Sequence, residues 1–507
     1  MVSMKTEAPG NSPTPRAERP SRTHRFFGRG PRPRRLLFTA RDLFALMAPL
    51  AVEQGLVMLV GMVDVAMISN VSEAAVSAVS LVDMMTYFFI VLFAALSAGG
   101  AVVVSQYLGA RRSSDAQSAA AQLIGLSFLF GCAVAAVMLP LENSVLSLLF
   151  GSVEPDVMDA AWLYLLFVVL SLPFLAVYDG AAAIFRSMNR TSVTMGVSFA
   201  SNVMNVAGNA LGVFAFQAGV LGVAVPTLTA RAFSAVAILV LAQRSDQPVP
   251  VRLRDIFHLQ RSMVRRILAI AVPGAIENGT FAFGKVVVVA IVALFGTTQM
   301  AANGVADSIE KLAVLVVTAN NLAVITVCGQ YLGAGDVPGA RFGVRQVMIV
   351  SFVATAVLGL GEIALLPALR PLFAVTDATW QIACVLIATH NLMAIAFHPA
   401  SFNLANALRA AGDVTFTMVV GIASLILCRL GCAYFVGVIA GWGIYGVWLG
   451  MGADWLARSI AFGLRWKSGV WERKSVIEDT NASNQVPDKA AGTPSAEPNR
   501  SKEECHA

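Results

Sequence analysis

Apolar stretches of about twenty residues, the length that crosses a bilayer as a helix, recur twelve times along this chain of 507 residues. Backbone groups in lipid must be hydrogen-bonded within the protein, which leaves helices and closed barrels. The alternating polar and apolar pattern of barrel strands is not evident. The composition agrees, because 57% of the residues are apolar and 13% are charged, against about a quarter charged in soluble domains. The sequence therefore predicts an all-α polytopic membrane protein.

The predicted transmembrane helices follow one another with short loops between most of them. We expect them near residues 43–69, 79–104, 119–141, 160–184, 191–215, 219–242, 267–295, 303–329, 343–369, 380–405, 415–438 and 442–464. No cleavable signal peptide is visible, so the first of these helices is expected to direct the chain to the membrane.

Arginine is distributed unevenly between the loops on the two sides of the membrane. On one side the loops hold Arg370 alone, and the longest of them, residues 141–160, is acidic. The loops on the side of the N-terminus hold Arg111, Arg112, Arg186, Arg190, Arg244, Arg252, Arg254, Arg261, Arg265, Arg266, Arg341, Arg345 and Arg409. Because basic loops stay in the cytoplasm, both termini are predicted to be cytoplasmic.

Both ends of the chain read as disordered tails. The first 35 residues contain eight Arg and one Lys against two Glu, with many prolines. Such a basic arm beside a membrane favours contact with anionic lipid over nucleic acid, so we expect the bilayer and no nucleic acid among its partners. The polar segment after Trp471 lacks the apolar residues of a packed core.

An internal repeat divides the chain. The five letters QYLGA occur at 106–110 and again at 330–334, a displacement of 224 positions. At the same displacement Pro49 meets Pro273 and Glu53 meets Glu277. The predicted organisation is a basic tail, an N-terminal six-helix lobe, a cytoplasmic linker, a C-terminal six-helix lobe and a polar tail, at residues 1–42, 43–242, 243–266, 267–466 and 467–507 respectively.

Two lobes of six helices have the same orientation in the bilayer, because six is even. We therefore expect a pseudo-two-fold axis along the membrane normal and a binding site near the midplane between the lobes. This architecture suits alternating access around a central cavity. A membrane enzyme or a receptor is the alternative from another class, and no metal or nucleophile constellation favours it; we expect no enzymatic activity.

The motifs resemble those of a known transporter family. They are "GMVDVAM" and "GGAVVVSQYLGARR" in the first half, "PGAIENGTFAFGK" and "CGQYLGAGD" in the second, and the ending "GVWLGMGADWLARSIAFGLRWKSGVW". Together these are similar to bacterial MATE (multidrug and toxic compound extrusion) transporters over residues 41–471, in both halves. The resemblance implies a multi-pass protein of the bacterial cytoplasmic membrane. It also implies an antiporter that exports organic cations, drugs or other amphipathic compounds in exchange for H⁺ or Na⁺.

Asp64 is the first candidate for the coupling group. It lies within "GMVDVAM" in the first apolar stretch, without a basic residue one turn away. A carboxylate inside the bilayer costs about 2.5–3.5 kcal/mol on insertion scales, and a proton or a bound cation relieves that cost. A structural carboxylate hydrogen-bonded within a packed interface is the alternative interpretation.

Asn205 and Asn209 are the second element of the predicted cation site. In two branches of the family, the first-helix acid works with an Asn that is followed four residues later by an Asp in the fifth helix. The stretch "SNVMNVAGNALG" matches at Asn205, but Asn209 stands where the acid would be. The spacing of four keeps both amides on one helix face, and the missing carboxylate leaves more of the coupling to Asp64.

Glu53 and Glu277 occupy equivalent positions four residues after Pro49 and Pro273. At about 1.5 Å per residue they lie about 6 Å along the helix from each proline, on the cytoplasmic side of the predicted cavity. They either attract a cationic substrate or pair with neighbouring polar groups such as Gln54 and Asn278.

Lys285 is two turns deeper than Glu277 on nearly the same face. Either it pairs across the cavity with Asp64 or Asp83 and exchanges partners when a proton arrives, or it forms a fixed salt bridge between the lobes. Tyr87 and Phe281 are candidates for an aromatic cavity wall, against ordinary packing. The predicted cavity therefore consists of Glu53, Asp83, Tyr87, Glu277, Phe281 and Lys285.

Two apparent nucleotide motifs fail on their context. "GTFAFGKV" at 279–286 lacks the Ser or Thr that follows the lysine of a P-loop, and "GWGIYG" at 441–446 opens an apolar helix. We expect no cofactor and secondary rather than ATP-driven transport. The remaining alternatives are a lipid-linked oligosaccharide flippase of the same superfamily, which would call for a more cationic cavity, and a twelve-helix major facilitator protein.

Overall fold

The computed structural model describes residues 33–150, 154–474 and 476–477. Over these ranges the chain is helical and contains no strand, as the apolar pattern predicts. The expected tails fall mostly outside the described residues. Of the expected N-terminal tail, residues 40–42 already belong to the first helix.

Twelve long helices are present among the described residues, in two sets of six. The first set is α1 (Ala40–Ile68), α2 (Glu73–Gly109), α3 (Ser113–Phe150), α4 (Pro155–Ser187), α5 (Thr191–Ala210) and α6 (Leu221–Ala242). The second set is α8 (Arg261–Ala293), α9 (Thr297–Gly333), α10 (Val337–Leu369), α11 (Asp377–Ala410), α12 (Val414–Ser424) and α13 (Ile444–Ser468). The short α7 (Leu253–Ile256) lies in the segment that joins the two sets.

Within the part of the chain that the structure describes, ten helical segments are long and apolar enough to cross a membrane. The two that fall short of this threshold are α5, which contains Asn202, Asn205 and Asn209, and α13, which contains Asp454 and Arg458. Both α5 and α13 pack against neighbouring helices of their own set. Polar side chains thus weaken the hydropathy signal in the helices that present them to the protein interior.

Three π-helical turns interrupt the regular helices. α5 continues as η2 (Leu211–Ala215), and α12 continues through η4 (Leu425–Leu430) and η5 (Ala433–Ile439). Single π turns inside α-helices are frequent at functional sites, because they rotate the side chains that follow. The turns η2 and η5 occur at corresponding places in the two sets, whereas the residues that correspond to η4 lie in the regular helix α5.

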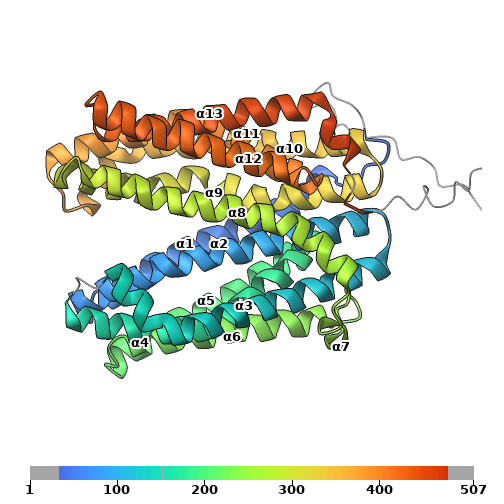
Figure 1. Ribbon diagram of the computed structural model, residues 1–507, viewed down its shortest axis with the longest axis horizontal. Coiled ribbons are helices and arrows are strands. Elements are labelled where there is room, and N and C mark those ends of the chain that lie inside the picture. Colours follow the sequence, from blue (N-terminus) through green and yellow to red (C-terminus); the bar gives the residue numbers. More distant parts are fainter. Residues whose placement is uncertain (1–32, 151–153, 475, 478–507) are drawn as a thin grey trace, which may run out of the picture.

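The two sets form two lobes that lie side by side, with α1–α6 below and α8–α13 above in Figure 1. The helix α1 begins and α13 ends at the same end of the molecule, which we call the terminal end; it is at the right in Figure 1. At the terminal end one continuous apolar core draws residues from both lobes, among them Leu46, Tyr107, Tyr331 and Phe462. Other apolar cores among the described residues lie within single lobes. The larger one of the first lobe draws on residues from Ile68 to Ala224, and that of the second lobe draws on residues from Val292 to Trp455. The lobes are therefore joined at the terminal end.

The two QYLGA repeats make this joint. Gln106 donates from Nε2 to the carbonyl oxygen of Ala410 at 2.7 Å, and Gln330 donates from Nε2 to the carbonyl oxygen of Ser187 at 2.7 Å. The backbones also cross closely, because a Cβ on Gly109 would lie 2.0 Å from the carbonyl oxygen of Gln330, and one on Gly333 would lie 1.9 Å from that of Gln106. Each repeat therefore supplies both a hydrogen-bond donor and a glycine to the other lobe.

The tyrosines of the same repeats hold the start of the opposite lobe. Tyr107 in the first lobe accepts a hydrogen bond from Arg266 near the start of α8. Tyr331 in the second lobe accepts one from the backbone N–H of Leu37, just before α1, at 3.2 Å. The contacts at the terminal end thus obey the pseudo-two-fold relation that the repeat predicts.

We expect Gly109→Ala and Gly333→Ala to lower the melting temperature of the purified protein. Overpacking costs about 1–3 kcal/mol, and it exceeds the gain of up to about 1 kcal/mol from replacing a helical glycine by alanine. Gly304→Ala on α9 is the matched control, because nothing lies within 4 Å of the added Cβ. If Gly109→Ala and Gly333→Ala both melt at or above the melting temperature of Gly304→Ala, the two backbones do not approach as closely as described.

Candidate functional site

The side chains of Asp64, Asn205 and Asn209 lie together in the first lobe. Asn209 donates from Nδ2 to Oδ1 of Asp64 at 2.7 Å and to Oδ1 of Asn205 at 3.3 Å. Asn205 in turn donates from Nδ2 to the hydroxyl oxygen of Thr227 on α6 at 3.3 Å. A chain of hydrogen bonds therefore connects α1, α5 and α6 through the three residues that the sequence selects.

The local structure explains why these amides face Asp64. Asn205 and Asn209 are one helical turn apart on α5, so their side chains project from one face. Asn209 is fully buried and Asn205 is 7% exposed. The π turn η2 begins two residues after Asn209 and changes the helix register beyond it.

Arg231 is a member of this group that the sequence analysis missed. It lies in the middle of α6, donates from Nη1 to the hydroxyl of Ser171 at 2.7 Å, and interacts electrostatically with Asp64, Asp83 and Asp179. The sequence did contain a signal for it, because an arginine inside an apolar helix is costly unless it has partners. Arg231 thus supplies a positive charge near the carboxylates of Asp64, Asp83 and Asp179.

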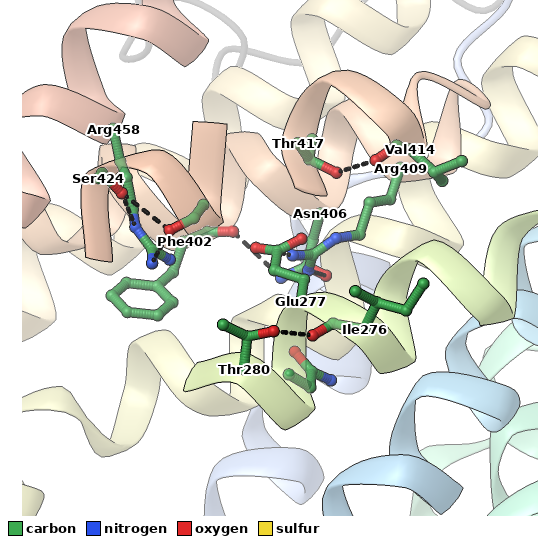
Figure 2. Close-up of polar contacts among 12 residues, drawn as sticks. Ile276, Glu277, Thr280, Phe402, Asn406, Arg409, Val414, Thr417, Ser424 and Arg458 are labelled. Atoms are coloured by element: carbon green, nitrogen blue, oxygen red, sulfur yellow. Dashed lines mark hydrogen bonds and ion pairs between the residues drawn. The ribbon is translucent and has the colours of Figure 1, made fainter. Parts of the chain in front are cut away.

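Glu53 and Glu277 each form a buried ion pair with an arginine of the same lobe. Oε1 of Glu53 lies 3.1 Å from Nη2 of Arg186, and Oε1 of Glu277 lies 2.7 Å from Nη2 of Arg409. Figure 2 shows Arg409 reaching from α11 to the carboxylate of Glu277 on α8. The two arginines are themselves related by the repeat, at a displacement of 223 positions.

The surroundings of the two glutamates differ in detail. Thr194 donates its hydroxyl to Oε2 of Glu53 at 2.8 Å. The counterpart oxygen, Oε2 of Glu277, is buried and has no hydrogen-bond partner among the described residues. Neither glutamate is hydrogen-bonded to Gln54 or Asn278; the sequence left Arg186 and Arg409 out of consideration because they flank loops.

Lys285 lies against aromatic rings. Its Nζ is 5.8 Å from the ring centre of Tyr87 on α2 and 5.9 Å from that of Phe281 on α8. Within 4.0 Å of it the described residues contain no carboxylate, so neither Asp64 nor Asp83 pairs with it in this conformation. The structure thus brings Tyr87, Phe281 and Lys285 together across the boundary between the lobes.

Phe281 also contacts two arginines of the second lobe. The guanidinium carbons of Arg429 and Arg458 lie 5.2 and 5.3 Å from its ring centre. Arg458 pairs with the fully buried Asp454 at 2.9 Å, and Arg429 lies 4.0 Å from the same carboxylate. The carboxylate of Asp454 is thus shared by two arginines, and Arg429 also interacts electrostatically with Glu310.

Known transporters are similar to this chain in sequence. The model of the MatE family matches residues 49–211 and again 273–435. The uncharacterized transporter YisQ of Bacillus subtilis is 29% identical over 443 residues, which cover 86% of this chain and 96% of YisQ. A probable multidrug resistance protein NorM of Thermotoga maritima is 26% identical over 450 residues, which cover 86% of this chain and 94% of that protein.

Solved structures share the fold. A multidrug resistance MATE transporter of the MOP superfamily in its outward-facing conformation superimposes with a TM-score of 0.79 at 18% identity, covering 84% of this chain and 96% of that one. A MATE transporter in its straight conformation gives a TM-score of 0.78 at 19% identity, with the same coverage. The family model matches more than half of this chain, once in each lobe. The chain therefore belongs to the MatE family of membrane transporters.

Proposed function

We propose that this protein is a secondary antiporter that exports organic cations, drugs or other amphipathic compounds in exchange for H⁺ or Na⁺. Family membership supports transport, and the relatives named as probable multidrug resistance proteins support a small-molecule substrate. The observation that carries the proposal is the carboxylate of Asp64 held by Asn209 between helices of the first lobe.

We propose that the terminal end faces the cytoplasm of a bacterial cell. This end holds most of the arginines, among them Arg111, Arg112 and Arg190 in loops and Arg345 near the start of α10. With this orientation, the shared core closes the cytoplasmic side, and the separate cores away from it leave the lobes free to part on the outer side. The conformation is then the one from which a bound substrate is released outward.

Asp64 has the properties of a coupling group. One carboxylate oxygen accepts the Asn209 amide at 2.7 Å, and Arg231 supplies a nearby positive charge. A neutral amide does not remove the cost of holding the ionised form in a membrane, so a proton or a cation stabilises the site when it binds. Ion binding and release would then favour different arrangements of α1, α5 and α6, which is the differential stabilisation that coupling requires.

We expect Asp64→Asn to abolish efflux driven by an ion gradient while the protein still folds. The amide cannot change its charge, but it fills the same volume beside Asn209. The assay is the efflux of a fluorescent organic cation from everted vesicles under a pH gradient and then under a Na⁺ gradient, which also identifies the counter-ion. Asp115→Asn, which removes an acid in the first turn of α3 that pairs with Arg112, is the control. Export by Asp64→Asn at the wild-type rate under both gradients would refute the coupling role.

We further propose that Asp83, Tyr87, Phe281 and Lys285 line the substrate cavity between the lobes. The contact of Lys285 with rings from both lobes supports this, because a substrate entering there meets aromatic surface and a cation together.

For Glu53 and Glu277, the buried arginine partners favour a pairing role over direct attraction of substrate. MatE membership and the NorM relatives favour export of small molecules over a lipid-linked oligosaccharide flippase.

The pairing role predicts the behaviour of Glu277 variants. Glu277→Ala leaves Arg409 buried without its carboxylate, which costs about 3–5 kcal/mol in comparable pairs. We therefore expect a clear drop in melting temperature for Glu277→Ala, and recovery of most of it in Glu277→Gln combined with Arg409→Gln. Glu53 and Arg186 offer the same pair of variants in the other lobe. Unchanged stability of Glu277→Ala together with weaker substrate binding would instead assign Glu277 to the substrate.

A further inference from the structure

A second set of buried titratable groups lies in the other lobe, away from Asp64. Nε2 of His390 on α11 is 2.9 Å from Oε2 of Glu310 on α9. Nδ1 of His390 is 3.0 Å from Oδ1 of Asn391, and Asn391 donates from Nδ2 to Oε2 of Glu362 on α10 at 2.8 Å. The side chains of Glu310, His390, Asn391 and Glu362 thus form one chain of polar contacts, here called the line, that connects α9, α11 and α10.

The amide of Asn391 fixes the direction of this line. Its Nδ2 also donates to the backbone carbonyl of Gly359 at 3.1 Å, and a carbonyl oxygen accepts only. The Oδ1 atom of Asn391 therefore faces Nδ1 of His390, and this imidazole nitrogen must carry a proton. The other ring nitrogen approaches a carboxylate oxygen of Glu310 at 2.9 Å, and two lone pairs at that distance repel each other. Oε2 of Glu310 is buried and has no hydrogen-bond partner among the described residues, so a proton taken up by either group would relieve this repulsion.

The surroundings keep water away from this proton. The His390 side chain is 2% exposed. The rings of Trp448 and Trp455 lie in edge contact with the imidazole, with ring centres 5.8 and 5.2 Å from its own. Glu362 is 6% exposed, and its Oε1 has no hydrogen-bond partner among the described residues. The Glu310 side chain is 17% exposed. The Asn391 amide hydrogen-bonds to Glu362 but does not pass a proton to it, because its Nδ2 hydrogens stay directed at Glu362 and Gly359. The group that can exchange a proton is therefore the pair of the partly accessible Glu310 and the buried His390.

The charges around the line come from every helix that packs on it. On α9, Asp307 pairs with Lys311 at 2.9 Å, and these two charges cancel. On α13 and η4, the carboxylate of Asp454 neutralises the charge of one of two arginines, Arg458 and Arg429. The remaining positive charge acts on Glu310. His398 lies two turns further along α11, stacked on Phe402. With both glutamates ionised and His390 neutral, one negative charge is in excess, and one proton neutralises it.

We propose that Glu310, His390, Asn391 and Glu362 form a second proton-binding site, which takes up and releases one proton in the exchange cycle. This rests on the proposed antiport, and it adds a site in the second lobe to Asp64 in the first. No bond other than those to the proton is made or broken. The proton enters at the Glu310 carboxylate and is held between Oε2 of Glu310 and Nε2 of His390.

The two tryptophans allow proton binding to be measured without transport, because imidazolium quenches the fluorescence of an adjacent indole. Purified protein is titrated between acidic and alkaline pH while tryptophan emission is recorded. We expect emission to fall with acidification in the wild type and this transition to vanish in His390→Gln. We expect Glu310→Gln to move the transition to more acidic pH by about one unit or more, since an opposite charge at this distance is lost.

Two controls separate the outcomes. His398→Gln removes the other imidazole near Trp455 and is expected to retain the transition. Asp64→Asn is also expected to retain it, so that loss of coupled efflux in Asp64→Asn tests the antiporter and the fluorescence tests the second site. In proteoliposomes, the protons moved per substrate should fall to roughly half in Glu310→Gln, since one of two intramembrane sites is lost. A transition that persists unchanged in both His390→Gln and Glu310→Gln overturns the proposal.

Discussion

The close crossing of the two QYLGA repeats is the contact on which the rest of the structure depends. Gly109 and Gly333 let two backbones meet at distances that no side chain permits. The glutamines of the same motifs then bond to carbonyl oxygens at the ends of α4 and α11. Because the contact is reciprocal, it joins the lobes about the pseudo-two-fold axis and leaves their far halves with separate cores.

The lobes share a frame and differ in their chemistry. Both keep a buried glutamate–arginine pair, Glu53–Arg186 and Glu277–Arg409. The positions of the second lobe that correspond to Asp64, Asn205, Asn209, Thr227 and Arg231 hold Val288, Cys428, Cys432, Met451 and Trp455. In the other direction, the positions that correspond to Glu310, Glu362 and His390 hold Thr86, Met138 and Phe167. Each lobe therefore has a polar group of its own, and the other lobe holds apolar or weakly polar side chains at almost all of the corresponding positions.

The fold was predictable from the sequence because apolar length and the repeat are long-range signals. All twelve expected spans correspond to described helices, most of which extend several residues beyond the expected ends. The helix ends were harder to predict, because polar turns at the membrane surface continue the helix without an apolar pattern. Asp64 was found because carboxylates are rare in membrane segments, and Asn205 and Asn209 were found from the resemblance of their stretch to the fifth-helix motif of MATE transporters.

The partners of the site residues were less predictable. Arg186 and Arg409 were read as loop charges, yet both turn inward to glutamates. Lys285 was expected beside a carboxylate and lies beside Tyr87 and Phe281. Pairing between helices depends on their rotation and on side-chain reach, and no local pattern in one segment contains that information.

Distances between the lobes at both ends of the molecule test this account most directly. Spin labels at Arg111 and Ala334 report the terminal end, and labels at Glu73 and Thr297 report the opposite end; all four positions are exposed. Double electron–electron resonance in lipid nanodiscs would compare acidic with alkaline pH, or low with high Na⁺. The account predicts that one distance lengthens as the other shortens, as the terminal joint opens. Two distances that stay constant, or that change in the same direction, would contradict it.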